Sequence, residues 1–273
     1  MRAVKRFKFA RFYCCILLGI VVLLSGCDRF LKQEDNPVKF NSKPKVKEAV
    51  DLDKALKARV DAGILNLQAG DPQRALHHFN KAREWNNESS DLHNGFAMLY
   101  RYEGDAKKEE EHYKLAIKYN KKDPKIHHNY GSFLCDQQRY NEGLKQLKMA
   151  AGNYSYKNRH QSFENLGLCA IKEGDRELAF KSFNRAYRID KEMPITILNL
   201  SMLEFETGNN QRAYRLFKEY MGLDRHTAQS LWLGIQLERI FGDKDALASY
   251  ELALRRLFPR SNEFQFYQSS LTP

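Results

Sequence analysis

One pattern of turn, small and aromatic residues recurs along most of this chain and constrains its fold more than any other feature. A Gly followed by Asp or Asn begins each copy, and small and aromatic residues follow at fixed offsets. Two copies show the pattern fully: Gly70, Ala75, Phe79 and Ala82, and Gly174, Ala179, Phe183 and Ala186. The turn glycines at 70 and 104 are 34 residues apart, as are those at 174 and 208. A period of this length indicates an array of short repeats.

The period and its composition match the tetratricopeptide repeat, in which two antiparallel helices meet at the Gly-Asp turn. A small residue seven positions before each turn Gly lets the two helices approach, and the aromatic residue fills the space between neighbouring repeats. Because one pair of helices cannot bury its apolar side alone, the pairs must stack. We therefore predict an all-α fold, a right-handed superhelix of about six helix-turn-helix repeats.

The predicted array covers residues 49–260. The expected repeats are 56–89, 90–123, 124–152, 160–193, 194–226 and 227–260. The third repeat fits the pattern more loosely than the others, and an irregular stretch from Gly152 to Arg159 separates it from the fourth. Residues 261–273 are expected to form a C-terminal tail.

The N-terminal segment has the form of a bacterial export signal. Five cations precede a short apolar run, residues 16–24, which is too short to span a membrane. The run ends in Leu-Ser-Gly before Cys27, a sequence that resembles the lipobox of bacterial lipoproteins. We therefore expect removal of residues 1–26 as a signal peptide and acylation of Cys27. Residues 27–48, polar and containing two prolines, are expected to form a flexible tether between the lipid and the repeats.

The expected lipid anchor decides which partners are reasonable. The predicted location is the periplasmic face of the outer membrane, although Asp28, directly after Cys27, favours inner-membrane retention in enteric bacteria. Removal of the five signal cations lowers the net charge from +11 to +6. Because an exported protein rarely meets nucleic acid, this charge favours acidic protein surfaces or anionic lipid headgroups as partners.

Two cysteines fall within the predicted array, Cys135 and Cys169. An oxidising compartment permits a disulfide between them. The sequence offers no framework of regularly spaced cysteines, however, and small buried apolar residues on helices are the other interpretation. We expect the second.

No pattern in the chain is typical of a catalytic or metal site. It lacks a Gly-rich phosphate loop, a Gly-x-Ser-x-Gly turn and a His-Glu-x-x-His pair. The adjacent pairs His77-His78 and His127-His128 point roughly 100° apart on a helix, so they are expected to be polar surface rather than metal ligands. We therefore expect no enzyme activity, no cofactor, no metal and no small-molecule substrate.

The first helix of each repeat supplies the candidate binding surface. In tetratricopeptide arrays this helix lines the concave face, where an extended partner segment can lie. At equivalent positions of three such helices stand Asn129, Asn165 and Asn199. A carboxamide both donates and accepts hydrogen bonds, so this ladder suits the backbone of an extended peptide.

An apolar stripe on the first helix is a second candidate. Val60, Ile64 and Leu67 fall on one side of it, since steps of four and three residues return to the same face. Two interpretations stay open for this stripe. It forms a docking groove for a partner segment, or it packs against Leu52 and Leu56 of a lead-in helix.

A third candidate lies nearer the C-terminus. Met202 and Phe205 occupy the same face of the fifth repeat, and Trp232, with Leu231 and Ile235 beside it, follows in the sixth. Apolar side chains at positions that a soluble array would normally solvate indicate a docking surface.

Three longer stretches are more specific than the repeat itself. They are residues 128–134 with 138–140, residues 163–168, and residues 230–235 running on to 256–259. With the lipobox and the tether, these stretches resemble the PilF/PilW family of type IV pilus biogenesis lipoproteins over essentially the whole mature chain. The resemblance implies a pilotin, a lipoprotein that helps the pilus secretin reach or multimerise in the outer membrane. The residues alone also suit a lipoprotein scaffold for another envelope machine, such as outer-membrane protein assembly or peptidoglycan enzymes.

Overall fold

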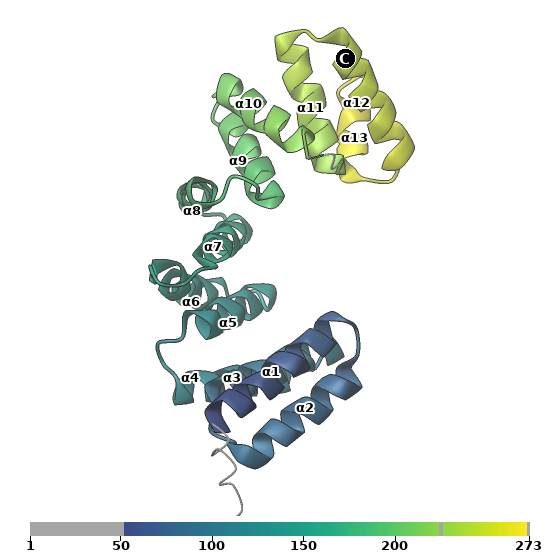
Figure 1. Cartoon of the computed structure of the whole chain (residues 1–273). Helices are drawn as coiled ribbons and strands as arrows, with labels where there is room; N and C mark the ends of the chain where they lie inside the picture. Colours follow the sequence, from purple (N-terminus) through teal and green to yellow (C-terminus); the bar gives the residue numbers. More distant parts are fainter. Residues whose placement is uncertain (1–51, 224–225, 272–273) are drawn as a thin grey trace, which may run out of the picture. The chain divides into compact units, whose positions relative to one another are not determined.

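The computed structural model describes residues 52–223 and 226–271, and within these ranges it contains thirteen α-helices and no strand (Figure 1). The predicted all-α fold is confirmed. Cys27, the expected signal peptide and the expected tether lie outside the described residues. Over the same ranges, none of the helices has the length and apolar character that a membrane crossing requires.

Consecutive helices form six pairs, and we call the first helix of each pair the A helix and the second the B helix. The A helices are α1 (Leu52–Gln68), α3 (Ser90–Glu103), α5 (Pro124–Asp136), α7 (Arg159–Glu173), α9 (Pro194–Glu206) and α11 (Ala228–Phe241). The B helices are α2 (Pro72–Trp85), α4 (Ala106–Tyr119), α6 (Tyr140–Gly152), α8 (Arg176–Ile189), α10 (Asn210–Met221) and α12 (Lys244–Leu257). A last helix, α13 (Asn262–Ser269), packs against α11.

The turn between A and B helices explains the recurring Gly-Asp pair. Five of the six turns contain a glycine with left-handed backbone, with φ between 76° at Gly104 and 91° at Gly174. At the third turn Gln138 takes this conformation instead, with φ 60°. The next residue starts the B helix, and in four repeats its Asp carboxylate accepts a hydrogen bond from the backbone N–H three residues later. The pair is thus a helix stop followed by a helix start.

The aromatic residue of the B helix interlocks neighbouring repeats, as the pattern predicted. Phe79 of α2 is fully buried between Gly63 of its own A helix and Gly95 of the next one. A Cβ atom added at Gly63 would stand 2.3 Å from Phe79 Cε1, and one added at Gly95 would stand 2.7 Å from the same atom. Phe183 lies in the same way against Gly167. Small residues are required on the A helices because the ring fills that space.

Both ends of the array differ from expectation. The first A helix runs unbroken from Leu52, so the described residues contain no separate lead-in helix before the first repeat. At the other end, the stretch expected only as a tail forms α13, whose Tyr267 is buried against Leu231 and Leu254. A terminal repeat has no following repeat to cover its apolar side, and α13 takes that place.

Cys135 of α5 and Cys169 of α7 form a disulfide, which corrects the prediction that they are unpaired buried residues. Their Cα atoms are 5.7 Å apart. The bond ties the third repeat to the fourth across the irregular stretch between Gly152 and Arg159, which the structure places where the sequence suggested. Both cysteines are buried, as expected, but their sulfur atoms are bonded to each other.

Candidate partner-binding site

The apolar stripe of the first A helix belongs to the core. Val60 and Leu67 keep only 1% and 8% of their surface exposed and pack in one cluster with Leu56 and Phe79. Ile64 is half-buried against the same cluster. The assignment of Val60 and Leu67 to partner binding is therefore wrong, because α2 and α3 cover this side of α1. The alternative is right that the stripe is core and clusters with Leu56, but Leu56 lies on the same helix and not on a separate lead-in helix.

The three asparagines do not form one ladder. Asn129 Nδ2 donates to Asn94 Oδ1 at 2.8 Å, and Asn165 Nδ2 donates to Ser132 Oγ at 2.8 Å. Each of these bonds joins one A helix to the A helix before it. Asn199 Nδ2 instead donates to a carbonyl of its own helix at 2.8 Å. Two of the three predicted residues thus link repeats to one another, and the third stands apart.

Asn129 and Asn165 line a polar pocket of about 280 Å³ beside the disulfide. At its rim, Asp136 Oδ2 lies 2.8 Å from a guanidinium nitrogen of Arg101, and Asp136 Oδ1 lies 3.4 Å from Lys172 Nζ. Asp136 thus pairs with both cations that line this pocket.

His127 is a structural link and not the polar surface that the sequence suggested, whereas His77 is exposed, as expected. The ring of His127 is buried, with Nδ1 2.6 Å from Gln146 Oε1 and Nε2 2.9 Å from Lys121 O. His93, one repeat earlier, contacts His112 and a backbone carbonyl in the same way. Neighbouring His128 is neutral at pH 7, since burial lowers its pKa to about 4. Throughout 52–223 and 226–271, no three His, Cys, Asp or Glu side chains converge to hold a metal.

The third candidate group is brought together by the fold. Met202 and Phe205 of α9 and Trp232 of α11 line one pocket of about 340 Å³. All three side chains are half-buried, so each rests on the core and presents part of its surface to solvent. Leu231 and Ile235, expected beside Trp232, are fully buried and face the core of the last repeat instead.

Helix α13 completes this pocket with residues that sequence reasoning missed. Phe266, with 57% of its surface exposed, and Glu263 form part of its lining. A signal for α13 was present in the sequence. Ser261 caps the helix by accepting a hydrogen bond from the Phe264 backbone N–H, and Phe264 and Tyr267 follow at helical spacing.

We call this site the α9–α11–α13 pocket, and its chemistry suits a peptide. Three aromatic rings and a thioether form its apolar walls, and two Gln side chains can bond a backbone. Of its two acidic residues, Glu206 pairs with Arg176 at 2.7 Å, whereas Glu263 has no ion-pair partner in the described ranges. Such a pocket fits a partner segment with an apolar side chain next to a cation.

The fold defines the class of protein. Paired helices with left-handed Gly turns and interlocking aromatic residues make this a tetratricopeptide-repeat protein. A family model described as tetratricopeptide repeat matches residues 160–193, which cover the α7–α8 pair except for Arg159. Proteins of this fold act through binding of other proteins.

The chain belongs to the family of the type IV pilus assembly protein PilF. It is 32% identical over 253 residues to PilF of Pseudomonas aeruginosa, which covers 92% of this chain and 95% of that protein. A solved structure from the functional characterization of Pseudomonas aeruginosa PilF matches with a TM-score of 0.78 at 31% identity, over 80% of this chain and 99% of that chain. The family resemblance seen in the sequence is confirmed.

Two further proteins are similar to this chain. The crystal structure of PilW, described as a widely conserved type IV pilus biogenesis factor, has a TM-score of 0.67 at 22% identity, over 79% of this chain and 99% of that chain. At that identity PilW supports the fold. An uncharacterized protein of Haemophilus influenzae is 28% identical over 136 residues, 50% of this chain and 76% of that protein.

Proposed function

We propose that this protein is a pilotin, a lipid-anchored scaffold that promotes outer-membrane localisation or multimerisation of the pilus secretin by binding it. Membership in the PilF family supports a role in type IV pilus assembly. The observation that carries the binding role is the α9–α11–α13 pocket, where Met202, Phe205 and Trp232 keep apolar surface in reach of solvent. The role is binding rather than catalysis.

The anchor in this proposal is the lipid on Cys27, at the periplasmic face of the outer membrane. The tether of residues 27–48 separates the lipid from the first A helix, so that a partner can approach the repeats. Asp28 makes the inner membrane the alternative destination.

Capture of the partner follows from the chemistry of the pocket. An apolar side chain of the secretin that enters between Trp232 and Phe266 removes both partners' surfaces from water. Burial of about 100 Å² of apolar surface contributes roughly 2–3 kcal/mol, enough to anchor a segment whose backbone is held by polar groups. Gln229 and Gln236 of α11 supply those groups.

Phe266→Glu tests the proposed binding site. The side chain is 57% exposed, so the change should leave folding intact while it places a charge against the apolar walls. Leu257→Glu on α12 is the matched control, because Leu257 is 59% exposed and does not line the pocket. We expect co-purification of the secretin with the wild type and the control and its loss with Phe266→Glu.

Equal recovery of secretin with both variants would contradict this assignment of the site. Recovery of a different envelope protein, with no secretin bound to the wild type, would favour the alternative of a scaffold for another envelope machine.

A further inference from the structure

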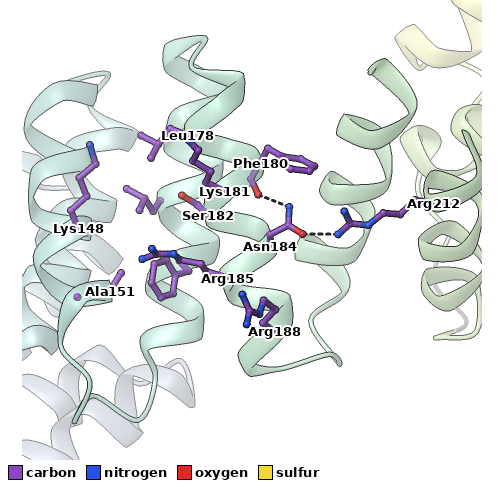
Figure 2. A pocket seen from close by; sticks show the side chains of 13 residues that line it. Lys148, Ala151, Leu178, Phe180, Lys181, Ser182, Asn184, Arg185, Arg188 and Arg212 are labelled. Carbon is purple, nitrogen blue, oxygen red and sulfur yellow. Dashed lines mark hydrogen bonds between the residues drawn. The ribbon is translucent and has the colours of Figure 1, made fainter. Parts of the chain in front are cut away.

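A second, larger pocket lies among α6, α7, α8 and α10 (Figure 2). Its volume is about 670 Å³, and it shares no residue with the α9–α11–α13 pocket. Its lining includes five cations and no acidic residue: Lys148, Lys181, Arg185, Arg188 and Arg212. We call it the basic pocket.

Three of the five cations have no carboxylate partner anywhere in residues 52–223 and 226–271. They are Lys148 of α6 and Arg185 and Arg188 of α8. The other two are held by the protein itself: Lys181 pairs with Glu177, and Arg212 pairs with the buried Glu204 at 2.6 Å. A recess that gathers unneutralised positive charge attracts anions.

Internal bonds hold one side of this pocket in place. A guanidinium nitrogen of Arg212 donates to Asn184 Oδ1 at 2.6 Å, and Asn184 Nδ2 donates to the Phe180 carbonyl at 3.0 Å (Figure 2). The first of these bonds joins α10 to α8, and the second lies within α8. The side of the pocket formed by Arg212 and Asn184 is therefore positioned before any ligand arrives.

The rest of the wall of the basic pocket is largely apolar. Phe163, Leu166 and Leu178 contribute to it, and the Arg185 guanidinium carbon lies 5.5 Å from the centre of the Phe163 ring. Arg212 lies over Phe180 in the same manner, at 5.9 Å. Stacking on a ring holds a guanidinium flat and leaves its outer N–H groups free to bind a carboxylate.

We propose that the basic pocket binds an acidic segment of a partner protein, in which Asp or Glu side chains flank an apolar or aromatic residue. Lys148 and Arg188 approach from two different helices and would hold the carboxylates, while the apolar side chain enters against Leu178 and Phe180, which are half-buried. The apolar walls favour a peptide over a headgroup, because a phosphate offers nothing to bury against them. This inference does not depend on which envelope protein fills the α9–α11–α13 pocket.

The test uses the full chain in detergent and a short fluorescent peptide that alternates pairs of Asp and Glu with Phe and Leu. A neutral control peptide carries Asn and Gln at the acidic positions. We expect the acidic peptide to bind, the neutral peptide to bind poorly, and the affinity for the acidic peptide to fall as salt rises. Lys148→Glu with Arg188→Glu should weaken binding about tenfold or more, since two attractive contacts become repulsive.

Arg255→Glu with Arg256→Glu is the matched control. It changes the net charge by the same amount, and like Arg188 both residues are exposed cations in the last turn of a B helix. Circular dichroism and the melting temperature should show that both double variants fold as the wild type does. The control should bind the acidic peptide with unchanged affinity.

Three results would overturn the proposal. The first is wild-type affinity for the acidic peptide in the Lys148→Glu/Arg188→Glu protein. The second is equal binding of the neutral and acidic peptides. The third is pocket-dependent binding of phosphatidylglycerol vesicles without binding of the peptide, which would assign the pocket to a lipid surface.

Discussion

Cys135 and Cys169 join the A helices of the third and fourth repeats through a disulfide that spans 34 residues of sequence. The two cysteines do not occupy equivalent positions. Cys135 stands four residues after the small residue Gly131, whereas Cys169 stands two residues after Gly167. The irregular stretch before α7 lengthens this step between repeats, and the disulfide fixes α5 against α7 at that place.

Loss of this disulfide should destabilise the protein. The bond closes a loop of 34 residues, so Cys135→Ala with Cys169→Ala should lower the free energy of unfolding by about 3–4 kcal/mol. Denaturant unfolding with and without reductant measures the loss. Reductant should destabilise the wild type and leave the double variant unchanged. Equal stability of the oxidised wild type and the double variant would contradict this role.

Gly63→Ala should also destabilise the protein, although alanine favours helices. The added Cβ would stand 2.3 Å from Phe79 Cε1, and the ring is fully buried and has no room to move. Overpacking of this kind costs roughly 1–3 kcal/mol. Gly152→Ala is the control, because a Cβ atom there meets nothing within 4 Å. A melting temperature that falls equally for both variants would show that the Phe79 ring does not exclude a side chain at position 63.

The fold could be predicted from the sequence because each repeated residue meets a local steric requirement. Gly104 takes a left-handed backbone, and Gly63 makes room for a ring. Neither requirement depends on distant parts of the chain. The binding site was harder to predict, since an apolar stripe on an A helix looks the same whether other helices cover it or not.

Position along the A helix did not by itself decide which predicted site residues are buried. Leu67 and Phe205 each stand four residues after the small residue of their repeat, yet Leu67 is core and Phe205 lines a pocket. Val60 and Leu198 each stand three residues before the small residue of their repeat, and both are core. Trp232 and Phe205, by contrast, reach a pocket whose remaining wall is α13. That wall could not be placed from the repeat pattern, because α13 lies outside the pattern. The disulfide was missed for a similar reason, since Cys135 and Cys169 break the register.

Acid should weaken the contact between α3 and α4. The Nδ1 atoms of His93 and His112 are 2.9 Å apart, and burial lowers the pKa of His112 from 6.5 to about 4. Below pH 6.5 the unfolded chain binds a proton that the folded chain excludes, so stability falls as the pH drops from 6.5 toward 4. Because the ring is partly exposed, we expect a loss of roughly 1–2 kcal/mol.

Denaturant unfolding of His112→Gln and wild type at pH 7 and pH 5 isolates this effect. The variant should lose less stability between the two pH values than the wild type does. Glu109, whose pKa burial raises to about 7, is present in both proteins, and the difference between them reports the contact of His112 with His93. His226→Gln, at an exposed position, is the control and should behave as wild type. Identical pH profiles for His112→Gln and wild type would contradict the assignment.

Lipidation should depend on Cys27 alone. Serine offers no thiol for the acyl group, so Cys27→Ser should abolish metabolic labelling with a fatty acid. Cys14→Ser with Cys15→Ser is the control and should keep the label, because both residues lie in the segment expected to be removed. Label that persists on the Cys27→Ser protein would place the anchor elsewhere.

The amount of secretin multimer in a strain that lacks this protein tests the pilotin role most directly. The secretin is resolved on a gel that preserves its multimers, beside the same strain complemented with the wild-type chain. We predict that multimers are lost from the outer membrane without the protein and return on complementation. Multimers of normal amount and location in the deletion strain would contradict the proposed function.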